Sequence, residues 1–167
     1  MNQCIIIRET IEVKSLGKKL NREELNLELA NVPVNLFGYE LVRTELLTNL
    51  LGKDAESILY WAGKELARNH PLTSYEDIVH FFEQASFGSL TCTKEKQHYH
   101  TYVLSGKIVD LRLADKNAGF SLEAGFLAEQ MQQITGMYTE AFAEVIKNKE
   151  VVITLKWDKK DSVADDE

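Results

Sequence analysis

The stretch from Phe120 to Trp157 decides the fold. FSLEAGFLAEQMQQI (120–134) predicts an amphipathic helix that ends at Gly136. YTEAFAEVIK (138–147) and EVVITLKW (150–157) predict two strands, the second with alternating apolar and polar residues. The stretch contains no His, no Cys and no glycine-rich phosphate loop, so it indicates an architecture and not a chemistry.

Three further helices are predicted upstream of this stretch. The first begins at Tyr39 and places Val42, Leu46 and Leu50 on one face. A second helix follows Asp54 and ends at His70-Pro71, because a residue that precedes proline is disfavoured in the α region. Its central Gly63 indicates close approach of another backbone, and Gly125 and Ala124 indicate tight packing of the later helix on the sheet. A capping box of Thr73 and Glu76 opens the third helix.

Period-two patterns then predict three more strands. They are SLTCTKEK (89–96), QHYHTYVL (97–104) and KIVDLRL (107–113), with Ser105-Gly106 as a hairpin turn. Helices followed by hairpin-linked strands predict an α+β fold with helices packed on one face of an antiparallel sheet. We expect an N-terminal arm (1–32), one domain (33–157) and an acidic disordered tail (158–167).

Composition excludes several classes of protein. The net charge of -7 argues against non-specific nucleic-acid binding, which needs a basic surface. No stretch approaches the roughly 20 apolar residues that span a bilayer, and no signal peptide is recognisable, so we expect a cytoplasmic protein without membrane insertion. The only cysteines, Cys4 and Cys92, fit a reducing compartment.

Cys92, His98 and His100 form the one cluster of metal-ligand side chains in the sequence. With Glu95-Lys96 as the turn, Cys92 lies opposite Tyr99 and both histidines point to the other face. A three-residue turn reverses that conclusion. No third ligand accompanies the histidines, so no metal site is predicted.

The second predicted hairpin pairs Tyr102 with Val109, His100 with Leu111 and His98 with Leu113. The histidines then share a face with aliphatic residues. Two interpretations stay open, namely hydrogen-bonded core histidines and polar groups at a ligand pocket.

Catalytic motifs are missing. There is no GxSxG elbow and no GxxxxGK[ST] loop. Glu123 and Glu129 are six residues apart on one helix and are interpreted as solvated, so they form no acid–base pair.

GYELVRTELLTNLLGKDAESILYWAGKELA (38–67), the Phe87-Gly88 junction and GFSLEAGFLAEQMQQITGMYTEAFAE (119–144) resemble the YslB family of uncharacterised bacterial proteins. The resemblance covers about residues 33–157. That family is similar to haem nitric-oxide-binding domains, vinyl-reductase-like domains and Golgi transport tethering (TRAPP-type) subunits. The resemblance implies a ligand-binding-domain-like fold with a potential cavity, and dimerisation through the early helices. The Tyr-x-Ser-x-Arg haem signature is absent, so the cofactor stays unknown.

These observations lead to one hypothesis and two alternatives. We expect a non-enzymatic homodimer that binds a small apolar or amphipathic ligand, a protein partner, or both, as a sensor or adaptor. The ligand would lie between the 120–135 helix and the sheet, against Trp61, His98, His100, Tyr102 and Phe126. The first alternative is an interaction subunit with a solid core and an apolar patch on Leu46, Leu47 and Leu50. The second is a small hydrolase-type enzyme with His98 or His100 as general base.

Overall fold

The computed structural model describes residues 21–30, 32–115, 119–146 and 150–162. The chain divides into two compact units, Met1–Val34 and Asn35–Glu167. The first unit contains helix α1 (Arg22–Ala30), which lies inside the arm predicted from the sequence. The side chain of Asn21 accepts a hydrogen bond from the backbone N–H of Glu24 and so caps the first turn of α1.

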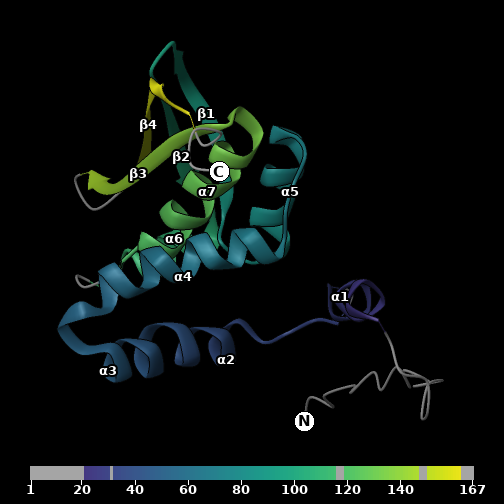
Figure 1. The fold of residues 1–167 in the computed structure, drawn as a ribbon. Coiled ribbons are helices and arrows are strands. Elements are labelled where there is room, and N and C mark those ends of the chain that lie inside the picture. The colour runs from purple at the N-terminus through teal and green to yellow at the C-terminus, as the bar shows by residue number, and fades with distance from the viewer. Residues whose placement is uncertain (1–20, 31, 116–118, 147–149, 163–167) are drawn as a thin grey trace, which may run out of the picture. The chain divides into compact units, whose positions relative to one another are not determined.

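The second unit begins with one continuous helical segment. It consists of α2 (Leu36–Glu40), a π-helical stretch η1 (Leu41–Leu46) and α3 (Leu47–Leu51), and we call it the α2–α3 segment (Figure 1). Asn35 caps its start by accepting from the N–H of Phe37. The helix predicted from Tyr39 is therefore confirmed, but it begins three residues earlier. Short π-helical stretches inside α-helices occur frequently at functional sites.

A 3₁₀ turn (Gly52–Asp54) leads into α4 (Ala55–Asn69), which ends before His70-Pro71 as predicted. The next helix, α5 (Tyr75–Gln84), is capped one residue later than expected. Ser74 Oγ accepts from the N–H of Asp77, and the hydroxyls of Thr73 and Ser74 donate to the Asp77 carboxylate. The capping box predicted for Thr73 and Glu76 is thus wrong by one residue, because Asp77 supplies the carboxylate.

Four antiparallel strands form the sheet in the order β1-β2-β4-β3. Their bounds are β1 (Ser89–Lys96), β2 (Tyr99–Ser105), β3 (Met137–Ile146) and β4 (Glu150–Ser162). The turn predicted at Glu95-Lys96 lies instead at Gln97-His98, because Lys96 pairs with Tyr99. The β1–β2 register also shifts between Cys92 and Lys94, so Cys92 lies opposite Tyr102 and not opposite Tyr99 as predicted. β2 also pairs with β4, where Tyr102 lies opposite Ile153 and His100 opposite Leu155.

The strand predicted over 107–113 is wrong. Residues Lys107–Arg112 form helix α6, which begins after Gly106 at a φ of 109°. Ile108, Val109 and Arg112 are the buried residues of α6, a helical spacing that the sequence pattern did not distinguish from alternation. β4 occupies the place beside β2, so the pairings predicted for Tyr102, His100 and His98 with 109–113 do not occur.

β4 is longer than its predicted end at Trp157. It continues to Ser162, which lies opposite Met137 at the start of β3. Five residues of the predicted acidic tail therefore belong to the sheet, and residues 163–167 lie outside the described residues. Among the described residues, no helix is long and apolar enough to cross a membrane.

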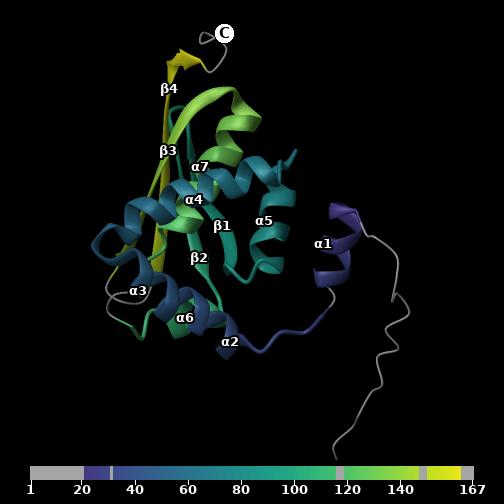
Figure 2. The same cartoon turned by 60° about the horizontal axis from the view of Figure 1, so that its bottom comes forward.

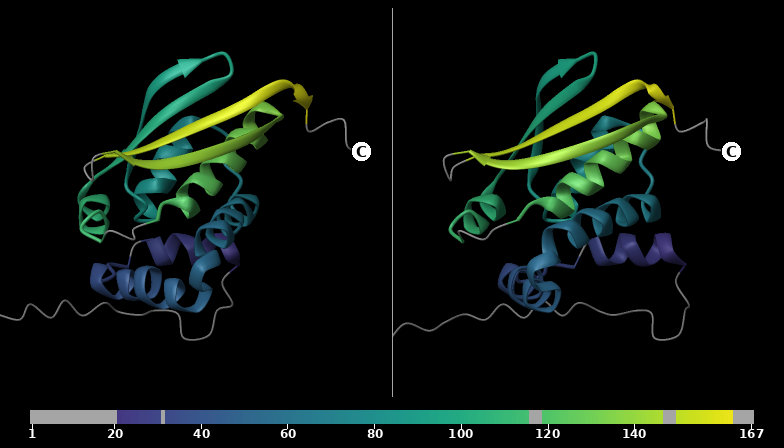
Figure 3. Two further views of the ribbon diagram at one scale, coloured as in Figure 1. Left: turned by 90° about the vertical axis from the view of Figure 1, so that its left-hand side faces the viewer. Right: turned by 60° about the vertical axis from the view of Figure 1, so that its left-hand side comes forward.

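Helix α7 (Ser121–Thr135) is the centre of the second unit. Figures 2 and 3 show α4, α5 and α7 on one side of the sheet, with α7 between the sheet and α4. A Cβ on Gly63 would overlap the Leu122 carbonyl, and a Cβ on Gly125 would overlap the Tyr60 carbonyl. The close approach predicted at Gly63 is confirmed. Gly125 contacts α4 and not the sheet, because the two helices cross backbone to backbone.

Candidate ligand-binding site

An apolar groove lies between the α2–α3 segment and helices α4, α5 and α7. Its volume is about 350 Å³, within the usual range for ligand pockets. The lining is Tyr39, Val42, Arg43, Leu47, Leu66, Phe81, Ala85, Phe87 and Leu122. The space is open to solvent, so it is a surface groove and not an interior cavity.

Aromatic rings form one wall of the apolar groove. Phe81 and Phe87 line it, and Phe126 lies behind them, stacked on Phe81 at a centroid distance of 4.5 Å. Phe126 itself is 0% exposed. The residue predicted to line the cavity is thus a support for the wall and lies one layer deeper.

A buried ionic network joins the α2–α3 segment to the rest of the unit. Arg43 Nη2 donates to both carboxylate oxygens of Glu123 at 2.7 Å. Arg112 Nη1 donates to Glu123 at 2.8 Å, and its Nε donates to Glu40 at 3.2 Å. Arg43 also lies over the Phe87 ring, 5.6 Å from its centroid. Two positive and two negative groups balance, so the network holds η1 and α2 against α6 and α7 without a net charge.

The electrostatics of this network centre on Glu123. Burial alone would lower the pKa of Arg112, but Glu123, Tyr39 and Glu40 together outweigh it, with Glu123 contributing most, and the pKa is raised. Arg112 therefore stays charged although it is almost fully buried.

Both α7 carboxylates were interpreted as solvated, and that interpretation is wrong. Glu123 is 0% exposed, and Glu129 is buried beside Lys64 and Arg68 of α4. Arg68 donates to Glu129 through Nε at 3.1 Å and through Nη2 at 3.2 Å. Since α7 is covered by the sheet, by α4 and by α6, its carboxylates need cations from neighbouring elements.

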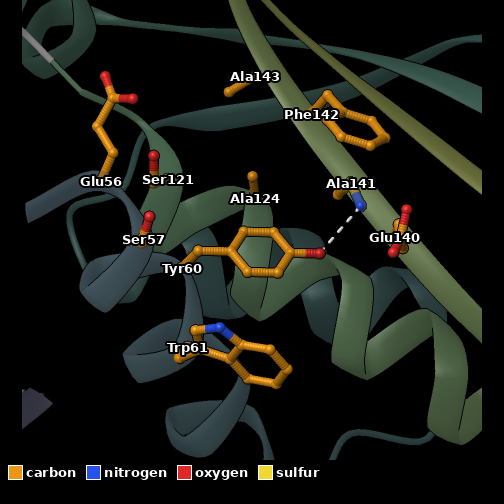
Figure 4. A pocket seen from close by; sticks show the side chains of 10 residues that line it. All are labelled: Glu56, Ser57, Tyr60, Trp61, Ser121, Ala124, Glu140, Ala141, Phe142 and Ala143. Carbon is orange, nitrogen blue, oxygen red and sulfur yellow. Dashed lines mark hydrogen bonds between the residues drawn. The ribbon is translucent and has the colours of Figure 1, made fainter. Parts of the chain in front are cut away.

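A second hollow, which we call the edge groove, lies between α4, the start of α7 and β3 (Figure 4). Its volume is about 390 Å³, and its lining is Glu56, Ser57, Tyr60, Trp61, Ser121, Ala124, Glu140, Ala141, Phe142 and Ala143. The backbone N–H of Ala141 donates to the Tyr60 hydroxyl at 3.2 Å. Burial raises the pKa of Tyr60, so its hydroxyl is neutral at physiological pH.

The predicted site residues do not share one lining. Trp61 borders the edge groove and is 63% exposed. His100 and Tyr102 lie together in the sheet, with His100 Nδ1 3.2 Å from the Tyr102 hydroxyl and the His100 ring edge-on to Trp157. His98 is exposed between β1 and β2. None of the three sheet residues lies in either groove.

The Cys92 thiol donates to the Lys94 carbonyl at 3.6 Å and to Glu95 Oε1 at 3.7 Å. Burial, and after it the neighbouring Glu95 carboxylate, raises the pKa of the Cys92 thiol. A protonated thiol is a poor nucleophile. No group of three His, Cys, Asp or Glu side chains within the described ranges is arranged to hold a metal ion. Cys4 lies outside the described residues.

The sequence is similar to one family model and to one curated protein. The model described as "Protein of unknown function (DUF2507)" matches residues 36–156. The uncharacterised protein YslB of Bacillus subtilis is 43% identical over 137 residues, which are 81% of this chain and 93% of that protein. The resemblance to YslB-like proteins inferred from the sequence is confirmed.

One of the similar solved structures supports the architecture. A vinyl-4-reductase family protein from Methanocaldococcus jannaschii superposes with a TM-score of 0.60 at 18% identity, over 83% of this chain and 89% of that one. A point mutant of the Fe(II) unliganded H-NOX protein from K. algicida gives a TM-score of 0.45 at 12% identity, over 77% and 76%. The first likeness supports the α+β fold and nothing further. The similarity to Golgi tethering subunits stays a prediction.

Proposed function

Because the chain belongs to the DUF2507 family of proteins of unknown function, its role has to be inferred from its own surfaces. We propose that it is a non-enzymatic domain that binds a small apolar or amphipathic molecule in the apolar groove. Binding of the molecule would reposition the α2–α3 segment and thereby change how the protein binds a partner. This is the role of a sensor or adaptor.

The observation that carries this proposal is the lining of the apolar groove. Nine side chains line it, from the α2–α3 segment, α4, α5, α7 and the turn after α5, and Arg43 is the only charged one among them. The Arg43 guanidinium is held by Glu123, so the groove presents hydrocarbon and aromatic surface to a guest. An apolar guest gains free energy by leaving water, at about 25 cal/mol for each Å² that it buries.

Coupling to a partner follows from the two sides of the α2–α3 segment. Val42 and Leu47 line the groove, whereas Leu46 and Leu50 lie outside its lining and are at least half exposed, Leu50 to 71%. Leu46 and Leu50 are four residues apart and form an apolar stripe on one side of the segment. We propose that the stripe is the homodimer contact, so that a shift of the segment changes assembly. A ligand achieves this only if it favours one of the two arrangements.

The histidines support a non-enzymatic role. The His100 ring lies 3.2 Å from a tyrosine hydroxyl through its Nδ1 atom. A general base needs a group that orients it and tunes its pKa. Burial raises the pKa of Tyr102, so its hydroxyl stays protonated and serves as a structural hydrogen-bond partner of His100.

Native mass spectrometry of the full chain, purified without added ligand, tests the proposal. We expect extra mass that is lost under denaturing conditions. The groove-filling variant Ala85→Leu should lose the extra mass, while Ala62→Leu, at an exposed position of α4, should keep it.

Titration with 1,8-anilinonaphthalene sulfonate provides a second readout that does not depend on a co-purified ligand. The wild type and Ala62→Leu should bind the dye with the same affinity, and Ala85→Leu should bind at least about ten-fold more weakly. Equal dye binding by all three proteins, together with no adduct on the wild type, would contradict the proposal.

A further inference from the structure

β3 is an outer strand of the sheet, and its free edge is only partly covered. The N–H of Thr139 donates to Gln132 Oε1 at 3.3 Å, and the N–H of Ala141 donates to Tyr60. Backbone groups alternate in direction along an antiparallel pair, so Ala143 and Val145 also direct N–H and C=O outward. Within the described residues, nothing accepts from these two N–H groups.

The edge groove adjoins this uncovered part of β3. Ala143 lines it, together with the exposed rings of Trp61 and Phe142, the latter 51% exposed. Paired residues share a face, so Ala141, Ala143 and Val145 face the helices with the core residues of β4. A strand added at this edge would direct every second side chain toward the edge groove.

The surroundings of the edge are acidic. Glu140 and Glu144 alternate with the inward-facing residues of β3, and Glu140 and Glu56 also border the edge groove. All three are exposed, and none has an ion-pair partner in the part of the chain that the structure describes. Lys156 lies opposite Glu140 on β4 without forming an ion pair. The charge of the edge therefore complements a basic strand.

We propose that this edge binds an extended peptide whose basic and apolar residues alternate. The peptide pairs with Ala143 and Val145 through backbone hydrogen bonds. Its apolar side chains enter the edge groove against Trp61, and its basic side chains lie beside Glu140 and Glu144. The site is separate from the apolar groove, so it does not depend on the function proposed above.

A second copy of the chain is a poorer occupant. Antiparallel self-pairing through Ala143 and Val145 would set Glu144 of one copy against Glu144 of the other. Like charges directly opposite each other destabilise a strand pair. A basic peptide avoids this repulsion and gains from the same carboxylates.

The direct test is an NMR titration of the ¹⁵N-labelled full chain with a capped heptapeptide in which lysine alternates with valine. We expect the largest shifts and new protection from hydrogen exchange at Ala143 and Val145. The same peptide with its central valine N-methylated should bind at least about ten-fold more weakly, because it lacks a backbone donor. A peptide with glutamate in place of lysine should bind more weakly still.

Variants of the protein check the same edge. Ala143→Pro removes an outward N–H, a position where an edge strand tolerates proline, and should weaken binding about ten-fold. Glu144→Lys should weaken it as well, whereas Glu45→Lys, in η1, should not. Should Ala143→Pro fail to fold, Glu144→Lys and the N-methylated peptide decide. Equal affinity for the N-methylated peptide, or shifts centred elsewhere, would overturn the proposal.

Discussion

The α4–α7 crossing and the α2–α3 segment are both helical, yet they are held in opposite ways. At the crossing, Gly63 and Gly125 bring two backbones into contact, and Phe126 stacks on Phe81 in a filled core. The α2–α3 segment instead rests on an apolar groove and is fixed by ion pairs from Arg43 and Glu40. None of its residues is fully buried.

The difference separates a scaffold from a part that can move. The contact between the two backbones leaves no room for a side chain, because a Cβ on either glycine would meet a backbone carbonyl of the other helix. Ion pairs above a groove tolerate a second arrangement if a guest fills the space.

The largest effect is expected at the link between them. Glu123→Leu leaves Arg112 and Arg43 buried without their shared carboxylate and should cost about 3–5 kcal/mol in the free energy of unfolding. Urea denaturation followed by circular dichroism measures this loss. Glu45→Leu, on the exposed side of η1, is the control and should stay within about 0.5 kcal/mol of the wild type. Equal free energies of unfolding for the two variants would show that the ion pairs of Glu123 do not stabilise the fold.

The scaffold should be sensitive to a single methyl group. Gly125→Ala places a Cβ against the Tyr60 carbonyl and should cost about 2–3 kcal/mol, because α4 and α7 must separate. Gly38→Ala, which meets no atom within 4 Å in α2, should instead stabilise by about 0.5–1 kcal/mol. Thermal or urea unfolding of both variants checks the contrast. A stable Gly125→Ala protein would refute the account of the crossing.

The exposed stripe should matter for assembly and not for stability. Leu50→Ser should change the free energy of unfolding by less than about 0.5 kcal/mol. It should shift sedimentation from dimer to monomer if the stripe is the proposed homodimer contact. Leu111→Ser, at an exposed leucine of α6, is the matched control. Unchanged sedimentation of the Leu50 variant would remove the stripe from the dimer contact.

The smallest effect is expected at the start of α5. Hydrogen bonds from Ser74 and Thr73 lower the pKa of Asp77 below its ordinary value of 3.8. A carboxyl group with a lowered folded-state pKa stabilises the fold above pH 3.8, and this contribution disappears as the pH falls through the folded value. Asp77→Asn should therefore unfold more easily at pH 7, and its stability should approach that of the wild type as the pH falls through the lowered pKa of Asp77. A stability difference that persists in acid would contradict this assignment.

Sequence patterns predicted the long elements well. The helix at 121–135, the glycine crossing at Gly63 and the last two strands have strong and lengthy patterns. The strand predicted for KIVDLRL (107–113) is wrong because a pattern of seven residues fits both a strand and a short helix. Only Gly106 and the length of β4 distinguish the two structures.

The site was harder to predict because it depends on long-range contacts. Trp61 borders a groove, but Phe126 lies behind a different groove, and His100 packs on Trp157. The strand predicted at 107–113 is wrong, and it paired the histidines with Leu111 and Leu113. The predicted cavity lining therefore included His98 and His100. The burial of Glu123 was also missed, since its cations come from residues 11 and 80 positions away.

Native-state hydrogen exchange of the full chain compares the two regions most directly. The free energy of opening measured at the amides of residues 42–51 should be at least about 2 kcal/mol lower than that measured at residues 125–131. Saturating 1,8-anilinonaphthalene sulfonate should reduce this difference in opening free energy. Exchange of both regions with one free energy, unchanged by the dye, would contradict a movable segment over a binding groove.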